Sequence, residues 1–102
     1  MASSKANRFD KLLYEQSLWS KANAHPARIK IIDYLLDHGI TPYKELCKGI
    51  PLGRETVSQH LRSLRKLDII KLEEKFPHSY YELNQEKCRD LLHKAKLLYP
   101  NL

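Results

Sequence analysis

The sequence has few of the features that mark membrane proteins, secreted proteins and enzymes. None of its apolar stretches approaches the roughly 18 residues of a membrane-spanning helix, and no apolar segment follows a basic start, so we expect a cytoplasmic protein. With three glycines among 102 residues, it lacks a glycine-rich phosphate-binding loop. It also shows no nucleophile beside a base and no carboxylate pair in a recognisable motif, which predicts that it is not an enzyme.

Cysteine is also scarce. Cys47 and Cys88 lie far apart in the sequence and form no CxxC pair, which indicates reduced thiols rather than a disulfide framework. Two interpretations remain for them: a thiol-based redox switch, or small hydrophobic side chains in the core. Both cysteines fall on expected apolar faces without an obvious basic neighbour to activate the thiol, which favours the second interpretation.

Positive charge is what the sequence has in excess. Its 18 Lys and Arg residues against 12 Asp and Glu give a formal net charge of +6 and an isoelectric point near 9.4. Half of this excess lies in one short stretch, where four basic residues accompany a single acid and leave +3: Arg54, Arg62, Arg65 and Lys66 against Glu55. This concentration favours a polyanionic partner.

The same stretch, residues 53–67, has helical periodicity. Val57, Leu61 and Leu64 recur on one face, and polar or basic residues occupy the rest of the helical wheel. We expect a DNA-recognition helix whose first turn faces base edges and whose later basic residues contact phosphates. At the edge of the buried face, His60 is expected to be structural rather than a phosphate contact. The predicted DNA-binding residues of this helix are Arg54, Thr56, Ser58, Gln59, Arg62, Ser63, Arg65 and Lys66.

Two shorter helical segments precede this stretch. One begins at Pro26 and ends before Gly39, and its expected core face consists of Ile29, Ile32, Leu35 and Leu36. Thr41, as an N-cap, predicts a second helix that ends at Gly49, with its inward residues being Leu46 and Cys47. Short helices joined by a turn that contains glycine are typical of helix-turn-helix proteins.

A two-stranded hairpin is expected after the recognition helix. The period changes to two, with apolar positions at Ile70, Leu72, Tyr81 and Leu83. Because the tip over residues 75–79 has no glycine, we expect a turn longer than two residues. A hairpin directly after a recognition helix is a wing, whose candidate DNA contacts are Lys75 and His78, with a solvated tip as an equal alternative.

Two further apolar stripes lie near the ends of the chain, one in a helix over residues 7–23 and one in a last helix over residues 85–99. Asn84 caps the last helix and Pro100 stops it. Together the stripes exceed what one small core covers, which suggests a homodimer interface, although the first could equally pack on its own core. The predicted interface residues are Phe9, Leu12, Leu13, Trp19, Leu91, Leu92, Ala95, Leu98 and Tyr99.

These elements predict one domain over residues 1–102. Its fold class is mainly α with a small β-hairpin, a winged helix-turn-helix in which the hairpin lies between the fourth and fifth helices. Residues 7–23 and 85–99 are the expected dimerisation helices.

The residues that carry these predictions resemble the arsenical-resistance (ArsR) family of bacterial winged-helix repressors. The likeness runs from about residue 21 to residue 84 and includes AHPARIKII at 24–32, KEL at 44–46, TVSQHLRSL at 56–64 and YYELN at 80–84. The resemblance implies a homodimer whose first and last helices form the interface, and it adds Glu55 to the DNA-binding residues of the 53–67 helix. It also implies two recognition helices in successive major grooves of a pseudo-palindromic double-stranded DNA operator.

The sequence departs from the family where metal sensors carry their cysteines. Pro42 and Lys44 occupy these positions, and neither can bind a soft metal there. A second family metal site lies on the last helix, where Asp90 and His93 share a side, but an ordinary solvated pair is favoured because no second His follows. We therefore expect no metal and no cofactor.

The expected function is that of a homodimeric, sequence-specific transcriptional repressor. Two alternatives stay open: a winged helix that binds protein in a larger complex, and a repressor that senses redox state through thiols. A protein-binding face would be dominated by acidic or apolar residues, so the basic residues of the 53–67 stretch favour nucleic acid.

Overall fold

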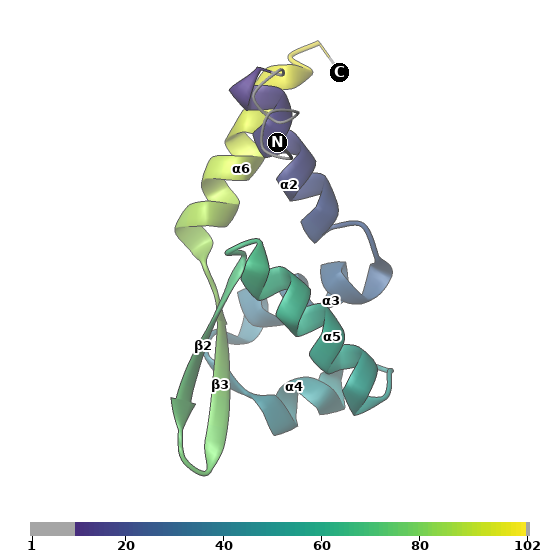
Figure 1. The fold of residues 1–102 in the computed structure, drawn as a ribbon, viewed down its shortest axis with the longest axis vertical. Helices are drawn as coiled ribbons and strands as arrows, with labels where there is room; N and C mark the ends of the chain where they lie inside the picture. The colour runs from purple at the N-terminus through teal and green to yellow at the C-terminus, as the bar shows by residue number, and fades with distance from the viewer. Residues whose placement is uncertain (1–9, 102) are drawn as a thin grey trace, which may run out of the picture.

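The computed structural model describes residues 10–101, which form five helices and a three-stranded sheet. In chain order these are α2 (Lys11–Ala22), α3 (Pro26–His38), β1 (Thr41–Pro42), α4 (Tyr43–Gly49), α5 (Arg54–Lys66), β2 (Ile70–Lys75), β3 (His78–Leu83) and α6 (Gln85–Leu98). Helices α3 to α5 and the sheet form a body from which α2 and α6 extend side by side (Figure 1). Within residues 10–101, no helix has the length and apolarity needed to span a membrane.

The core lies between α3, α4, α5, the sheet and the start of α6. Helix α5 buries Val57, Leu61 and Leu64 at an exposed fraction of 1% or less, as its periodicity predicted. These side chains belong to one buried cluster, which also includes Ile31, Leu35, Leu46, Ile50, Ile69, Ile70 and Leu83. One continuous core of this kind holds α5 rigidly with its opposite face outward.

Helix α3 has the predicted ends but a different core face. It begins at Pro26 and is followed by Gly39, whose φ of 71° lies in the left-handed region. Ile32 packs against the core, but Ile29 and Leu36 are 49% and 57% exposed, so their predicted burial is wrong. The helix carries apolar residues on two sides, and packing against α5 and β3 selects the side that contains Ala27, Ile31 and Leu35.

The sequence predicted Thr41 as a helix N-cap, and this prediction is wrong. Thr41 is instead part of strand β1. It pairs with Tyr81, and its hydroxyl donates to the Gly39 carbonyl at 2.9 Å. The reason is local, because a residue that precedes proline is pushed towards extended conformations. The short strand adds an edge to the hairpin and gives the sheet the order β1-β3-β2.

The hairpin is as predicted except at its tip. Strands β2 and β3 are antiparallel and pair from Ile70 with Leu83 as far as Lys75 with His78. The turn therefore contains only Phe76 and Pro77, joined by a cis peptide bond, and the longer turn expected from the lack of glycine is wrong. Proline presets its own φ, so this turn does not need the positive φ that glycine supplies.

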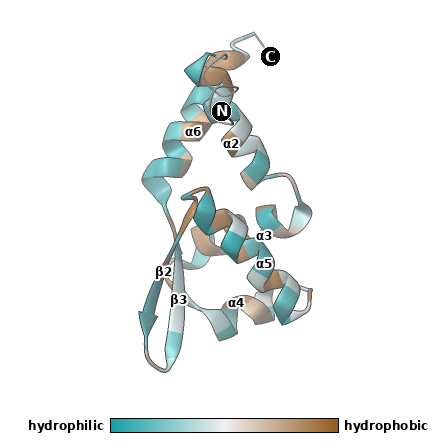
Figure 2. Cartoon of the chain, in the orientation of Figure 1, coloured by the Kyte–Doolittle hydropathy of each residue, from teal (hydrophilic) through white to brown (hydrophobic). Residues whose placement is uncertain are grey.

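Helix α6 begins where the sequence predicted and ends one residue earlier, at Leu98 instead of Tyr99. The Asn84 side-chain oxygen accepts from the Lys87 amide at 3.3 Å, and the helix ends at Leu98, shortly before Pro100. It packs along α2. The ends of α2 and α6 that point away from the sheet carry hydrophobic residues (Figure 2). Lys94 of α6 bridges Glu15 of α2 and Asp90, which lies 3.0 Å away.

Candidate nucleic-acid interface

The outer face of α5 is the most basic exposed surface of a single helix in the described part of the chain. Of the eleven predicted DNA-binding residues, Ser58 and Ser63 are half-buried, and the other nine are exposed: Arg54, Glu55, Thr56, Gln59, Arg62, Arg65, Lys66, Lys75 and His78. Among residues 10–101, none of the ion pairs involves a basic residue of α5. No ion pair within residues 10–101 therefore neutralises these charges.

The first turn of α5 is held by a tyrosine that the sequence analysis missed. Helix α5 starts after Gly53 without a side-chain cap, which leaves its first amides without an intrahelical acceptor. The hydroxyl of Tyr43, the first residue of α4, lies 3.2 Å from the Arg54 carbonyl and 2.8 Å from Ser58 Oγ. No local signal links residues this far apart in sequence, so only the packing of α4 on α5 reveals the contact.

The Tyr43 hydroxyl remains protonated at neutral pH. Its hydrogen bond with Ser58 lowers the pKa, but burial and the neighbouring Cys47 raise it by more, and the net pKa is above the ordinary value for tyrosine. Tyr43 is thus a neutral hydrogen-bonding group beside the basic face of α5.

The opposite edge of α5 is fixed to the corner between α2 and α3. Arg28 donates from Nε to His60 Nδ1 at 3.3 Å and from Nη1 to the Lys21 carbonyl at 2.8 Å. The His60 ring also lies 4.6 Å from that of His25, centroid to centroid. Burial, with the nearby charges of His25 and Arg28, lowers the pKa of His60. This arrangement supports the structural role predicted for His60.

The wing is less basic than α5. Lys75 forms an ion pair with Glu73 at 3.5 Å, and His78 lies edge-on to the Tyr80 ring. Phe76 at the tip is fully exposed. A paired lysine adds less to a positive surface than an unpaired one, so α5 dominates the electrostatics of this face.

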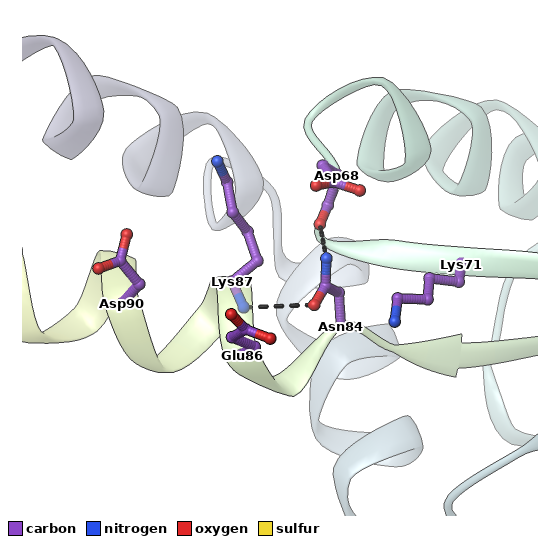
Figure 3. Close-up of a pocket in the computed structure, with 6 residues that line it drawn as sticks. All are labelled: Asp68, Lys71, Asn84, Glu86, Lys87 and Asp90. Atoms are coloured by element: carbon purple, nitrogen blue, oxygen red, sulfur yellow. Dashed lines mark hydrogen bonds between the residues drawn. The ribbon is translucent and has the colours of Figure 1, made fainter.

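The end of α5 is joined directly to α6. After the helix, Asp68 adopts a φ of 62°, and its carbonyl accepts from Asn84 Nδ2 at 3.0 Å. Asn84 also donates from its backbone amide to Ile69 at 2.8 Å. Figure 3 shows Asn84 between Asp68 and Lys87, within a polar hollow. One side chain therefore caps α6 and ties it to the last turn of α5.

The predicted interface residues divide into two groups. Leu91 is fully buried, and Trp19 is half-buried and packs against the core, so both contribute to packing within the protomer. Leu13, Leu92 and Tyr99 are 48%, 43% and 59% exposed, and the half-buried residues are Leu12, Ala95 and Leu98. Phe9 lies outside the described residues.

The cysteines and the candidate metal ligands are not assembled into a site in the described structure. Cys88 is buried, and burial raises the pKa of its thiol to about 11, which disfavours the reactive thiolate. Cys47 is half-buried against the core. Within residues 10–101, no three His, Cys, Asp or Glu side chains gather as possible metal ligands. Asp90 instead pairs with Lys94.

Sequence comparisons match this chain to bacterial regulators. Residues 25–71 match the family model described as bacterial regulatory protein, arsR family. The chain is 32% identical over 80 residues to the transcriptional repressor PagR of Bacillus anthracis, a match that covers 78% of this chain and 77% of PagR.

Solved structures give the same result. HlyU from Vibrio cholerae N16961 has a TM-score of 0.70 and 27% identity, over 85% of this chain and 97% of HlyU. The transcriptional repressor BigR from Xylella fastidiosa has a TM-score of 0.59 and 26% identity, over 96% of this chain and 92% of BigR. The predicted winged helix-turn-helix fold is confirmed, and the chain belongs to the arsR family of bacterial regulatory proteins.

Proposed function

We propose that this regulator is a homodimeric repressor that binds a pseudo-palindromic double-stranded operator in the cytoplasm. The observation that carries the proposal is the outer face of α5, where four basic side chains are exposed and none has an ion-pair partner among residues 10–101. Unpaired cations on the exposed face of a helix that is packed on a rigid core suit the negatively charged walls of the major groove. PagR and BigR, both named as repressors, support the direction of regulation.

Dimerisation through α2 and α6 would supply the two-fold symmetry of such an operator. The exposed apolar residues of these helices include Leu13, Leu92, Leu97 and Tyr99, each between 43% and 59% exposed. An apolar surface shared by two neighbouring helices fits an isologous contact with a second copy. Two recognition helices would then read half-sites about one helical turn, roughly 34 Å, apart.

We further propose that the regulator works without the cysteine metal site found in metal-sensing members of the family. Pro42 lies in β1 and Lys44 is exposed on α4, and neither side chain offers a thiolate to a soft metal. Release from DNA would then depend on another signal.

Fluorescence anisotropy with labelled genomic fragments, at two salt concentrations, tests sequence-specific binding. We expect one fragment to remain bound at the higher salt while bulk DNA dissociates. In addition, Gln59→Ala should relax base preference at one position by about 1–3 kcal/mol, whereas Arg65→Ala should weaken all sequences about equally. If all fragments behaved alike, the proposal would give way to non-specific or protein binding.

Sedimentation velocity over a range of protein concentrations tests the dimer. Leu92→Glu should shift the protein to monomer because it places a charge in the proposed interface. Ile40→Glu, at a residue that is 60% exposed next to β1, is the matched control and should leave the dimer intact. Equal behaviour of the two variants would contradict an interface on α6.

A further inference from the structure

A shallow hollow opens between α4 and the first half of α5, beside the proposed groove-reading residues. It is lined by Tyr43, Arg54, Glu55, Ser58 and Arg62. Its two guanidinium groups outnumber the single carboxylate, and in the described chain neither Arg nor the acid takes part in an ion pair. The hollow therefore keeps one net positive charge together with two hydroxyl groups, which is the donor set of an anion site.

The two hydroxyls can direct a proton outward. Tyr43 Oη and Ser58 Oγ lie 2.8 Å apart, and either can be the donor. When Tyr43 donates to Ser58, the Ser58 proton is free for an acceptor in the hollow. When the hollow is empty, Tyr43 can instead donate to the Arg54 carbonyl, 3.2 Å away. The two hydroxyl groups therefore have hydrogen-bond partners when no ligand is present. When a ligand binds, the Ser58 hydroxyl can donate a hydrogen bond to it.

We propose that this hollow binds one backbone phosphate of each operator half-site, with Ser58 as the donor, Tyr43 as the residue that positions it, and Arg54 and Arg62 as the charge partners. The inference rests on the proposed function and deepens it, because it assigns Ser58, predicted above only as a DNA-binding residue, to a backbone phosphate. A contact of this kind fixes the register of α5 in the groove without reading sequence.

The test uses full-length variants and the operator fragment selected by anisotropy. Ser58→Ala and Tyr43→Phe should each weaken binding about tenfold or more, on operator and unrelated duplex alike, since each removes support for a hydrogen bond to a charged group. The double variant should lose little more than either single variant, because the two hydroxyls act in series. Neither change removes a charge, so the salt dependence should stay that of the wild type.

Arg54→Gln and Arg62→Gln supply the contrasting result. Each should reduce the slope of log affinity against log salt by about one per subunit. Tyr34→Phe is the matched control, because this α3 tyrosine stacks on His38 and does not line the hollow. It should bind as the wild type does.

A scan with single methylphosphonate substitutions in the operator separates a phosphate contact from a purely structural role of Tyr43. The wild type should lose affinity at one phosphate per half-site, and Ser58→Ala should lose much less at that same phosphate. The proposal is overturned if no phosphate shows this difference, or if Ser58→Ala changes base preference instead. A wild type without any specific fragment would refute the proposed function itself, whereas specific binding that Ser58→Ala leaves unchanged would refute only the phosphate site.

Discussion

Helix α5 and helix α6 each bury leucines on one side and carry basic residues on the other, but their charges have different surroundings. The basic residues of α5 have no ion-pair partner within residues 10–101. On α6, Lys94 bridges Glu15 and Asp90, and these hydrogen bonds raise the pKa of Lys94. The two amphipathic helices therefore differ in one respect: Lys94 of α6 holds α2, whereas the four basic residues of α5 form no ion pair among residues 10–101.

The largest effect should come from removing the buried leucine that anchors each helix. Leu61 of α5 and Leu91 of α6 are 1% and 0% exposed, so Leu61→Ala and Leu91→Ala should each lower the free energy of unfolding by about 2–5 kcal/mol. Urea unfolding at two protein concentrations measures this. Leu92→Ala is the control on α6: if Leu92 lies at a dimer interface, its cost should shrink with dilution, because the dimer contributes less to the stability of both proteins. A much smaller cost for Leu91→Ala would mean that α6 is not part of the protomer core.

The difference between the two helices was only partly predictable from sequence. The 3.6-residue period located α5 and α6 because each has one dominant apolar face. On α3 the same method failed, since apolar residues lie on two sides and only tertiary packing decides that Ile31 is buried and Leu36 exposed. Thr41 was misassigned because its side chain suits a cap, whereas its position before proline favours a strand.

The features of the candidate site that lie on one helix could be predicted from the sequence. The contacts that join two helices could not. The exposed basic residues of α5 follow from helical spacing and composition. The contact between Tyr43 and Ser58 joins two helices across a turn, and no periodic signal reports it. The same is true of the bridge from Glu15 to Lys94, which joins residues near opposite ends of the chain. Long-range polar contacts of this kind depend on the folded geometry.

Removing one positive charge from α5 and one from α6 tests whether the basic residues of the two helices have different roles. Arg62→Gln should reduce the salt dependence of DNA binding by about one unit of slope per subunit, with little change in melting temperature. Lys94→Gln should do the opposite: it leaves the buried Glu15 carboxylate without its partner on α6 and should lower the melting temperature, while the salt slope stays unchanged. Thermal unfolding and anisotropy on the same samples measure both. A changed salt slope in Lys94→Gln would show that α6 contributes its charge to DNA binding after all.

The smallest expected effect concerns the inner edge of α5, where Arg28 donates a hydrogen bond to His60. Burial, together with the nearby charges of His25 and Arg28, holds the pKa of His60 below its ordinary value of 6.5. Above about pH 6.5 the neutral imidazole is favoured in both states, so its stabilising contribution is fully present there.

Below this pH the unfolded chain takes up a proton more readily than the folded one, so stability should fall as the pH drops towards the lower folded pKa of His60. Melting temperatures at pH 7.5, 6.5 and 5.5 should therefore decline more steeply for the wild type than for His60→Asn, whose amide oxygen can still accept from Arg28 but does not titrate. His93→Asn, on exposed α6 surface, is the control for losing a histidine elsewhere. If wild type and His60→Asn declined in parallel, the acid sensitivity would belong to other groups, and the joint between α3 and α5 would be held by packing and not by the protonation state of His60.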